Sequence, residues 1–375
     1  MKLKVLIIED EKPLSELLTQ AIREKLENLG HEPVFDHCSN ISQSVEPLRS
    51  IRPHFVTLDL RDDTTLDATA GKPAWNLIRD EHFCPVVFYS ANQLPEGFPD
   101  GTDPFARYLN KGSKEPKDVA ATIEEFVPHV LGLEQIRTEV EGRYAKSLQK
   151  VSSLIWKAET DPVVRNQSLL RVTRRRLAAT LEGPLGDETH IKAWEQFIYP
   201  PIDDHLCTGD VIFRRGGNRT TAEDFRVVLT PPCDLVTGEG RHPVNDILVG
   251  KCISVSHQEI LRIFSLQRDD KLPGRLATRL KGDRLEGKLI LPRLVDLWPA
   301  MVLDFKALEV VSRASVALSS ESANPESHFE RVASMDSPFS EALSWRFTHT
   351  VGRPGYPEVD EEALGADIQA AAAAS

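Results

Sequence analysis

The stretch LKVLIIEDEKPLSELLTQAIREKLENLG, residues 3–30, decides the fold of the first part of the chain. It begins with an unbroken apolar run rich in β-branched residues, which is typical of a strand buried on both faces of a parallel sheet. An amphipathic helix follows, with Pro13 in its first turn and Gly30 at its end. A buried strand that leads directly into such a helix predicts an α/β architecture.

The same alternation continues over residues 1–130. Further strand patterns occur at 33–37, 54–60, 84–90 and 106–110, and helix patterns at 42–52, 73–81 and from 116 onward. Five strands interleaved with helices predict an α/β fold with a doubly wound five-stranded parallel sheet. Prolines and glycines interrupt residues 93–105, so we expect a loop instead of a helix between the fourth and fifth strands.

Length, charge and cysteine content limit the classes of protein that the chain can belong to. Its 375 residues are enough for about two or three domains. The net charge of -12 argues against a protein-wide surface for nucleic acid, which is not an expected partner, although a local basic stripe could exist. No apolar run of about 18 residues and no signal peptide occur, so we expect a cytoplasmic protein outside the membrane. The five cysteines form no close pairs and are interpreted as free thiols.

Three further regions are predicted after the sheet. Residues 131–200 are predicted as a helical connector, which could also form a homodimer. Short strand-like runs such as GDVIFRR and ILVGKCISV then predict a C-terminal α+β output domain with a small β-barrel-like core over residues 201–357. The pattern SEALSWRFTHTVG predicts a late helix in this domain, and residues 358–375 are predicted as a flexible tail.

Carboxylates follow two of the predicted strands where each strand ends. Glu9 and Asp10 end the first strand, and Asp59 ends the third. In an open parallel sheet the carboxyl ends of these two strands diverge at the edge where ligands bind. Two charges about 4 Å apart repel by roughly 4 kcal/mol at an effective dielectric of about 20, so the group needs a proton or a cation. Carboxylate oxygens are ligands that Mg²⁺ prefers.

Two further polar residues end the remaining strands at the same edge. Ser90 ends the fourth strand, and Lys111 ends the fifth. A carboxylate nucleophile beside a divalent metal, a hydroxyl and an ammonium can accept a phosphoryl group, because each partner offsets negative charge on the transferred oxygens. The pattern therefore favours aspartyl-phosphate chemistry.

Residues 1–130 resemble the receiver domain of two-component response regulators, which has a CheY-like or flavodoxin-like fold. The resemblance rests on the order and spacing of five residues at strand ends: Glu9, Asp10, Asp59, Ser90 and Lys111. Two features depart from the family pattern. The loop after Asp59 is longer and more acidic, and we expect its side chains Asp62, Asp63 and Asp67 to be solvated. Gly112 also replaces the proline that commonly follows the lysine.

The resemblance implies a metal site around the acceptor. Asp59 becomes the phosphoacceptor and a ligand of Mg²⁺, and Asp10 becomes a direct ligand. Glu9 acts on the metal through water. The main-chain carbonyl of Arg61 becomes the third protein ligand.

The resemblance also implies how the site is used. Ser90 and Lys111 would contact the phosphoryl oxygens, and Tyr108 matches the aromatic switch of the family. A histidine kinase would donate the phosphoryl group, and the receiver would catalyse its own transfer and slow hydrolysis. The phosphorylated state would then act on the C-terminal domain or on a partner effector or second response regulator.

Two alternatives to this effector function remain open. The protein could instead be a phosphate sink or buffer in a phosphorelay, for example in phage defence, with no catalytic output. It could also be a DNA-binding transcriptional regulator, because two predicted helices flank GPLGD in the manner of a helix-turn-helix. The cluster RVTRRRL, with Arg171, Arg174, Arg175 and Arg176, is interpreted as a solvated, salt-bridged helix surface.

A candidate output site is the pair Cys233 and Asp234 in VVLTPPCDLVTG, which resembles the Cys-Asp segment after a strand in β-barrel modules of bacterial defence-related proteins. Three interpretations are open for this cysteine. It could be a nucleophile with His242 or His257 as base. It could bind zinc together with His205, Cys207 and Cys252. It could also be a buried structural cysteine at a strand end.

Overall fold

The structure is a computed structural model, and the chain divides into two compact units, Met1–Pro184 and Leu185–Ser375. Each unit is described by itself. The described residues are 1–61, 70–91, 93–98, 101, 103–181, 191–236, 243–255, 287–352 and 360–373. The predicted boundaries at residues 130 and 200 stay predictions.

The first unit contains the predicted parallel sheet. Its strands are β1 (Lys2–Ile8), β2 (Glu32–Cys38), β3 (Phe55–Leu58), β4 (Val86–Ser90) and β5 (Ala106–Asn110). Its helices are α1 (Lys12–Asn28), α2 (Val45–Ile51), α3 (Lys72–Asp80), α4 (Pro116–Ala158) and α5 (Pro162–Leu181), with a short 3-10 turn at Ile41–Gln43. The strand order is β2-β1-β3-β4-β5 and every pairing is parallel, which confirms the predicted doubly wound sheet.

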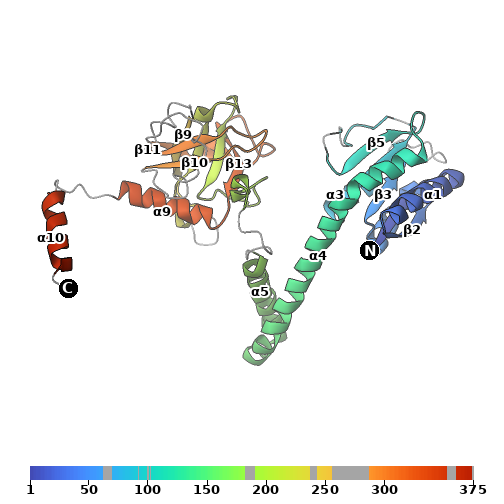
Figure 1. The fold of residues 1–375 in the computed structure, drawn as a ribbon, viewed down its shortest axis with the longest axis horizontal. Coiled ribbons are helices and arrows are strands. Elements are labelled where there is room, and N and C mark those ends of the chain that lie inside the picture. The colour runs from blue at the N-terminus through green and yellow to red at the C-terminus, as the bar shows by residue number, and fades with distance from the viewer. Residues whose placement is uncertain are drawn as a thin grey trace. The chain divides into compact units, whose positions relative to one another are not determined.

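Both faces of this sheet are covered by helices, as Figure 1 shows. Successive residues of β1 point to opposite faces, because side chains alternate along a strand. Val5 belongs to the apolar cluster under α1 and α4, whereas Leu6 belongs to the cluster under α2 and α3. This double burial explains why the first strand is an unbroken apolar run.

The crossover from β4 to β5 has no helix among its described residues 91, 93–98, 101 and 103–105. Its apolar side chains instead pack on the sheet. The ring of Phe98 contacts the ring of Phe88 on β4 edge-to-face, with centroids 5.5 Å apart. Leu94 joins the same apolar cluster. The predicted loop is therefore confirmed, and it covers the face that a helix would otherwise cover.

The connector begins as a single 43-residue helix, α4, which packs first against α1 and then pairs with α5. A capping box between Glu115 and Asp118 fixes its start. Of the two helices predicted to flank GPLGD, the second is not formed at residues 191–199. These residues form a 3-10 turn (Ala193–Gln196) and the strand β6 (Phe197–Ile198). Phe197 packs into the core of the second unit, so the predicted helix-turn-helix is not formed there.

The second unit contains a curled, mostly antiparallel sheet of order β10-β11-β9-β8-β7-β13-β12, with β6 paired to β13. Its other strands are β7 (Asp210–Arg214), β8 (Phe225–Val228), β9 (Asp246–Ser254), β10 (Lys288–Leu291), β11 (Met301–Ser312), β12 (Val316–Ala317) and β13 (Phe329–Met335). Short helical segments lie at Ala222–Asp224, Pro232–Leu235 (α6) and Arg313–Ser315. The predicted α+β class is confirmed, although the sequence patterns did not predict β11, β12 or β13.

Two helices follow the sheet, α9 (Phe339–Val351) and α10 (Glu361–Ala373). The first is the predicted late helix, and its Leu343 is buried in the core. The second lies in the predicted tail, and the flexibility of that tail stays a prediction. Within the described part of the chain, no helix combines the length and the apolar character that crossing a membrane requires.

Candidate functional site

The acidic residues after β1 and β3 meet because these two strands are neighbours in the sheet. Ile8 is paired with Leu58, so Glu9, Asp10 and Asp59 all follow at the same edge. Their carboxylate oxygens lie within 4.8 Å of one another, and they form the one such group of metal-ligating side chains among the described residues. Glu9 and Asp59 are buried, whereas Asp10 is half-buried.

Lys111 reaches this cluster from the end of β5. Its ammonium donates hydrogen bonds to Oε1 of Glu9 at 3.0 Å and to Oδ2 of Asp59 at 2.5 Å. Its main-chain N–H donates to the carbonyl of Ser90 at 3.0 Å, which ties the ends of β4 and β5 together. The structure thus brings together four of the residues on which the sequence prediction rests.

The second oxygen of Asp59 faces the start of the following loop. Oδ1 accepts hydrogen bonds from the main-chain N–H groups of Leu60 at 2.6 Å and Arg61 at 3.3 Å. A side chain at Gly71 would place its Cβ 3.0 Å from the carbonyl oxygen of Asp59, so the loop returns close to the acceptor. Arg61 therefore lies beside the site, and the role of its carbonyl stays a prediction. Asp62, Asp63 and Asp67 lie outside the described residues.

Burial and crowding perturb the acid–base properties of the cluster. Burial raises the pKa of the Glu9 carboxyl to about 7, although the ammonium of Lys111 opposes the rise. Burial alone would lower the pKa of Lys111, but its contacts with Asp59 and Glu9 outweigh burial and raise it. One ammonium thus faces three carboxyl groups.

This donor set fits a hard divalent cation. The ligand atoms are all carboxylate oxygens, and they converge at one edge of the sheet. The raised pKa of Glu9 means that its charged form is disfavoured when only Lys111 faces it. A cation would offset that cost, so the residues present are suitable ligands for Mg²⁺.

Ser90 and Tyr108 lie on the two strands that flank the loop of residues 91–105. Ser90 is fully buried at the end of β4. Tyr108 is half-buried against the α2 and α3 side of the sheet, and its hydroxyl accepts a hydrogen bond from the amide of Asn110 at 3.0 Å. The carbonyl of Ser90 accepts the N–H of Lys111, which places Ser90 beside the site, and the roles of Ser90 and Tyr108 stay predictions.

Two residues near Lys111 were not singled out from the sequence. Asn110 accepts a hydrogen bond from the N–H of Gly112 at 2.8 Å, which shapes the turn that follows β5. The aromatic ring of Tyr89 lies 5.8 Å from the ammonium of Lys111, and its hydroxyl donates to the carbonyl of Lys114 at 2.9 Å. An asparagine whose side chain can accept the N–H two residues later signals such a turn, whereas nothing local signals the contact of Tyr89.

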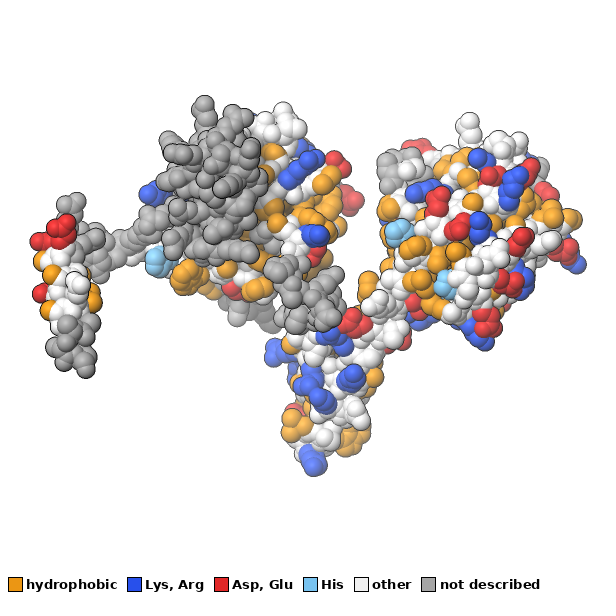
Figure 2. Space-filling view, in the orientation of Figure 1, with side chains coloured by type: hydrophobic (Ala, Val, Ile, Leu, Met, Phe, Trp, Pro, Cys, Tyr) orange, Lys and Arg blue, Asp and Glu red, His pale blue; other side chains and the backbone are white. Residues whose placement is uncertain are grey.

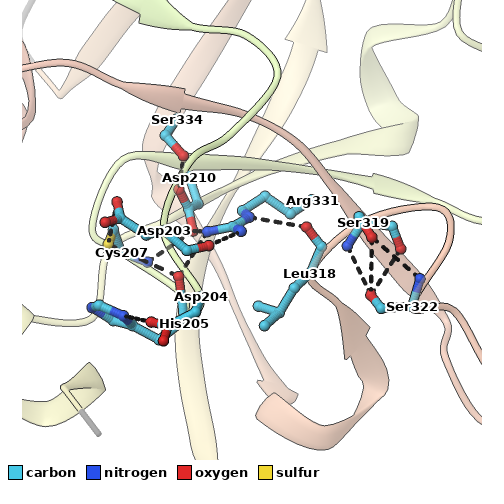
Figure 3. A network of polar contacts seen from close by, with 10 residues as sticks. All are labelled: Asp203, Asp204, His205, Cys207, Asp210, Leu318, Ser319, Ser322, Arg331 and Ser334. Carbon is cyan, nitrogen blue, oxygen red and sulfur yellow. Dashed lines mark hydrogen bonds and ion pairs between the residues drawn. The ribbon is translucent and has the colours of Figure 1, made fainter. Parts of the chain in front are cut away.

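The second unit contains a separate polar network, drawn in Figure 3. Arg331 is buried and donates to the main-chain carbonyls of Asp203, His205 and Leu318. It also pairs with the fully buried Asp210 at 3.6 Å. Together these contacts hold the loop before β7 against β13.

The proposed zinc ligands do not converge. Cys252 is buried in the apolar core, and burial raises its pKa to about 12. Cys233 is exposed on α6, and His205 is paired with Asp204. Among the described residues the zinc interpretation is therefore wrong, because ligands spread over a core, a helix and a loop cannot share one ion.

The cysteine at the candidate output site is not a buried structural residue either. Cys233 is exposed, and its thiol lies 3.7 Å from a carboxylate oxygen of its neighbour Asp234. Its proposed bases His242 and His257 lie outside the described residues. A cavity of about 300 Å³ lies beside α6, and the thiol that lines it is that of Cys207. Burial, reinforced by Asp210 and Asp203, raises the pKa of Cys207 to about 12, which disfavours a nucleophilic thiolate.

The strand order and the residues at the strand ends decide the fold of the N-terminal region. Residues 1–130 have a doubly wound, CheY-like fold, as the strand order β2-β1-β3-β4-β5 shows. No protein-family model and no curated protein matches the chain.

Similar solved structures cover about a third of the chain. The two component transcriptional regulator AraC from Clostridium phytofermentans ISDg is 19% identical over 36% of this chain and 98% of its own, with a TM-score of 0.28. The response regulator DrrB of Thermotoga maritima is 19% identical over 34% of this chain and 54% of its own, with a TM-score of 0.26. The anti-anti-sigma factor PhyR from Bartonella quintana is 22% identical over 37% of this chain and 51% of its own, with a TM-score of 0.25. The chain thus spans about half the length of the latter two.

Proposed function

We propose that the protein is a two-component response regulator that accepts a phosphoryl group on Asp59 from a histidine kinase and requires Mg²⁺. The observation that supports this proposal is the convergence of Glu9, Asp10 and Asp59 with the ammonium of Lys111 at the carboxyl edge of a parallel sheet. Glu9 and Asp59 are buried and share one ammonium, and burial of several carboxyl groups together is costly, so the arrangement favours a chemical role.

In the proposed reaction an oxygen of Asp59 attacks phosphorus, the phosphorus–nitrogen bond of the phosphohistidine breaks, and the departing imidazole nitrogen takes up a proton. Lys111 already contacts Oδ2 of Asp59, so its charge is positioned to stabilise the transferred oxygens. Two main-chain N–H groups hold Oδ1 and orient the carboxylate. Mg²⁺, held by Glu9, Asp10 and Asp59, would neutralise negative charge on the phosphoryl oxygens.

The output would begin at the same edge of the sheet. Helix α4 starts at Pro116, a few residues after Lys111, and continues without interruption into the pair with α5. We expect phosphorylation to bias a two-state element that involves Ser90, Tyr108 and the loop of residues 93–105. A change there would be passed on through the connector to the C-terminal domain or to a partner protein.

The test is phosphorylation of the full chain by phosphoramidate, a small donor that replaces the kinase, followed by intact-mass measurement. The wild-type chain should gain one phosphoryl group in Mg²⁺ and little in EDTA. Asp59→Asn should not be labelled, because an amide is not a nucleophile for phosphorus. Asp80→Asn, at the exposed end of α3, is the matched control and should be labelled like the wild type. Equal labelling of Asp59→Asn and wild type would overturn the assignment.

A further inference from the structure

The helical pair α4 and α5 is strongly basic in an otherwise acidic protein. Residues 143–181 contain nine Lys or Arg and two Asp or Glu, whereas the whole chain has a net charge of -12. Figure 2 shows Lys and Arg side chains gathered over this helical pair on the face toward the viewer. A local excess of this size is an electrostatic feature of its own, because charges farther away than about 8–10 Å are largely screened.

The basic residues of α4 form one row. Lys146, Lys150 and Lys157 are spaced by four and seven residues, which places them on the same side of a helix. The row spans about 16 Å at 1.5 Å per residue. Lys146 and Lys150 each precede by one residue the buried positions Ser147 and Val151 of α4, the helix that pairs with α5.

Helix α5 contributes a second row on the same flank of the pair. Arg171 and Arg175 are spaced by four residues, and both are exposed. Arg175 precedes the half-buried Arg176, whereas Leu177 follows it and lines an apolar groove between the helices. On α4, Leu148 likewise follows Ser147 and lines this groove. Within the paired segments, the buried residues of each helix face the other helix. Because the two helices are antiparallel, the residues that come just before these buried positions lie on one flank of the pair on both helices. The residues that come just after them lie on the opposite flank.

These side chains have no counterion in the described part of the chain. No ion pair involves Lys146, Lys150, Lys157, Arg171 or Arg175 among the described residues, although Arg143 pairs with Glu139 nearby. Among the described residues, the salt bridges expected for Arg171, Arg174, Arg175 and Arg176 are not found, whereas the expected solvation is confirmed for Arg171, Arg174 and Arg175, which are exposed. An array of unpaired cations is available to an anionic partner.

We propose that the basic flank of the α4–α5 pair, formed by Lys146, Lys150, Lys157, Arg171 and Arg175, binds the phosphate backbone of a nucleic acid. Two straight rows of cations match a regularly charged linear polyanion. Contacts of this kind position a protein on DNA or RNA without reading the base sequence. This binding does not depend on phosphorylation of Asp59.

The arrangement of the two flanks disfavours a membrane as the partner. A helix that binds an anionic membrane needs an apolar face next to its basic residues. Here the apolar groove, lined by Tyr144, Leu148, Leu170 and Leu177 among others, lies on the flank opposite the basic rows. An acidic helix of a partner protein would need the same apolar groove, and Arg174 is the one cation that lines it among the described residues. A polyanion that needs no apolar contact fits the basic flank better than either.

The experiment measures fluorescence anisotropy of a labelled duplex DNA of about 20 base pairs, and of the matching duplex RNA and single strands, with the unphosphorylated full chain. We expect binding at about 50 mM salt with a Kd on the order of 10 µM, because the acidic remainder of the protein opposes binding. The slope of log K against log salt should be roughly -4 to -5 for duplex DNA, since five cations displace counterions. The duplex and single-strand arms show whether DNA or RNA is preferred.

Three variants test the surface. Lys146→Gln/Lys150→Gln/Arg175→Gln should weaken binding at least about tenfold and reduce the salt slope by about one for each lost contact. The single variants Arg175→Gln and Arg174→Gln form a matched pair, because they remove the same charge from adjacent positions. Arg175 lies on the basic flank and Arg174 lines the groove, so the first should weaken binding more. Circular dichroism should show unchanged helix content in all three.

Three outcomes would overturn the proposal. One is the absence of binding to every nucleic acid at about 50 mM salt. Another is binding that the triple variant leaves within twofold of wild type. The third is tighter binding to vesicles of phosphatidylcholine and phosphatidylserine, or to polyglutamate, than to any of the nucleic acids.

Discussion

At the scale of single residues, Glu9 shows most clearly what the site lacks without a cation. It is buried beside Asp59, and the ammonium of Lys111 is the one cation within contact among the described residues. Burial therefore raises its pKa to about 7, so protonation and metal binding compete for the same carboxylate near neutral pH.

This competition predicts a pH-dependent affinity for Mg²⁺. Because the pKa of Glu9 lies at about 7, the carboxyl is mostly protonated below that pH and must lose the proton before it can act on the metal. The affinity measured by calorimetry should therefore be about tenfold weaker at about pH 6 than at about pH 8.

Glu9→Gln is the control for this measurement. It should bind Mg²⁺ more weakly at both pH values, and its affinity should change much less between them, because no carboxyl remains to titrate. Equal wild-type affinities at the two pH values would show that Glu9 does not compete in this way.

At the scale of elements, the crossover from β4 to β5 is the largest local departure from a regular doubly wound unit. Its Leu94 and Phe98 cover the sheet where a helix would otherwise lie. Side chains on a loop can replace a helix here because burial of apolar area depends little on the backbone that carries it.

Phe98→Ala should therefore loosen this part of the sheet. The ring is half-buried against Phe88, so its loss should reduce local stability by about 1–2 kcal/mol. Hydrogen exchange of the β4 amides should become faster by a corresponding factor of about 5 to 30. Glu96→Ala, an exposed change in the same loop, should leave the exchange unchanged. Slow exchange in both variants would show that the loop does not cover the sheet.

The helical pair α4–α5 predicts a second element-scale property. Among the residues of α5, Ser168 and Thr173 are the buried ones, and Leu170 in the groove is more than half exposed. Helices of this length depend on tertiary packing of their apolar sides. A second copy can pack groove to groove into a four-helix bundle without bringing the basic rows together, which supports the predicted homodimer.

Leu170→Asp should convert this dimer to a monomer, because it places a charge in the apolar contact. Light scattering after size-exclusion chromatography measures the mass directly. Gln at position 175, on the opposite flank, is the control and should leave the mass unchanged. A monomeric wild type, or a dimer that survives Leu170→Asp, would contradict the predicted interface.

At the scale of the whole molecule, each unit has its own apolar clusters. The clusters around Val5 and Leu6 belong to the first unit, and those around Val227 and Val249 belong to the second. In the second unit the buried pair of Arg331 and Asp210 adds a fixed polar contact to this core. Domains with separate cores can lose stability separately.

Arg331→Gln should destabilise the second unit by roughly 3 kcal/mol, because it leaves the buried Asp210 without its ion partner. Hydrogen exchange in β7 and β13 should become much faster, whereas exchange in β1 and β3 should not change. Arg293→Gln, an arginine exposed after β10, is the control. Faster exchange in β1 would show that the two units do not unfold independently.

The sequence determined most of the first unit and the positions of its candidate site. Alternation of apolar runs and amphipathic helices is a local property of the sequence, and so is the identity of the residue that ends each strand. Once the strand order was inferred, four residues could therefore be assigned to one edge of the sheet: Glu9, Asp10, Asp59 and Lys111. The second unit was less predictable, because its long strand β11 is buried on both faces at its start and mostly exposed in its second half, so it shows no uniform apolar pattern.

The tertiary structure alone decided which distant residues meet. Cys252 lies in the apolar core, whereas Cys233 is exposed on a helix, so the zinc interpretation is wrong. The rows of Lys146 and Arg171 joined into one flank only when α4 and α5 paired. The physical reason is that hydrophobic periodicity reports which face of an element is buried, whereas the partner of that face depends on how the chain folds back.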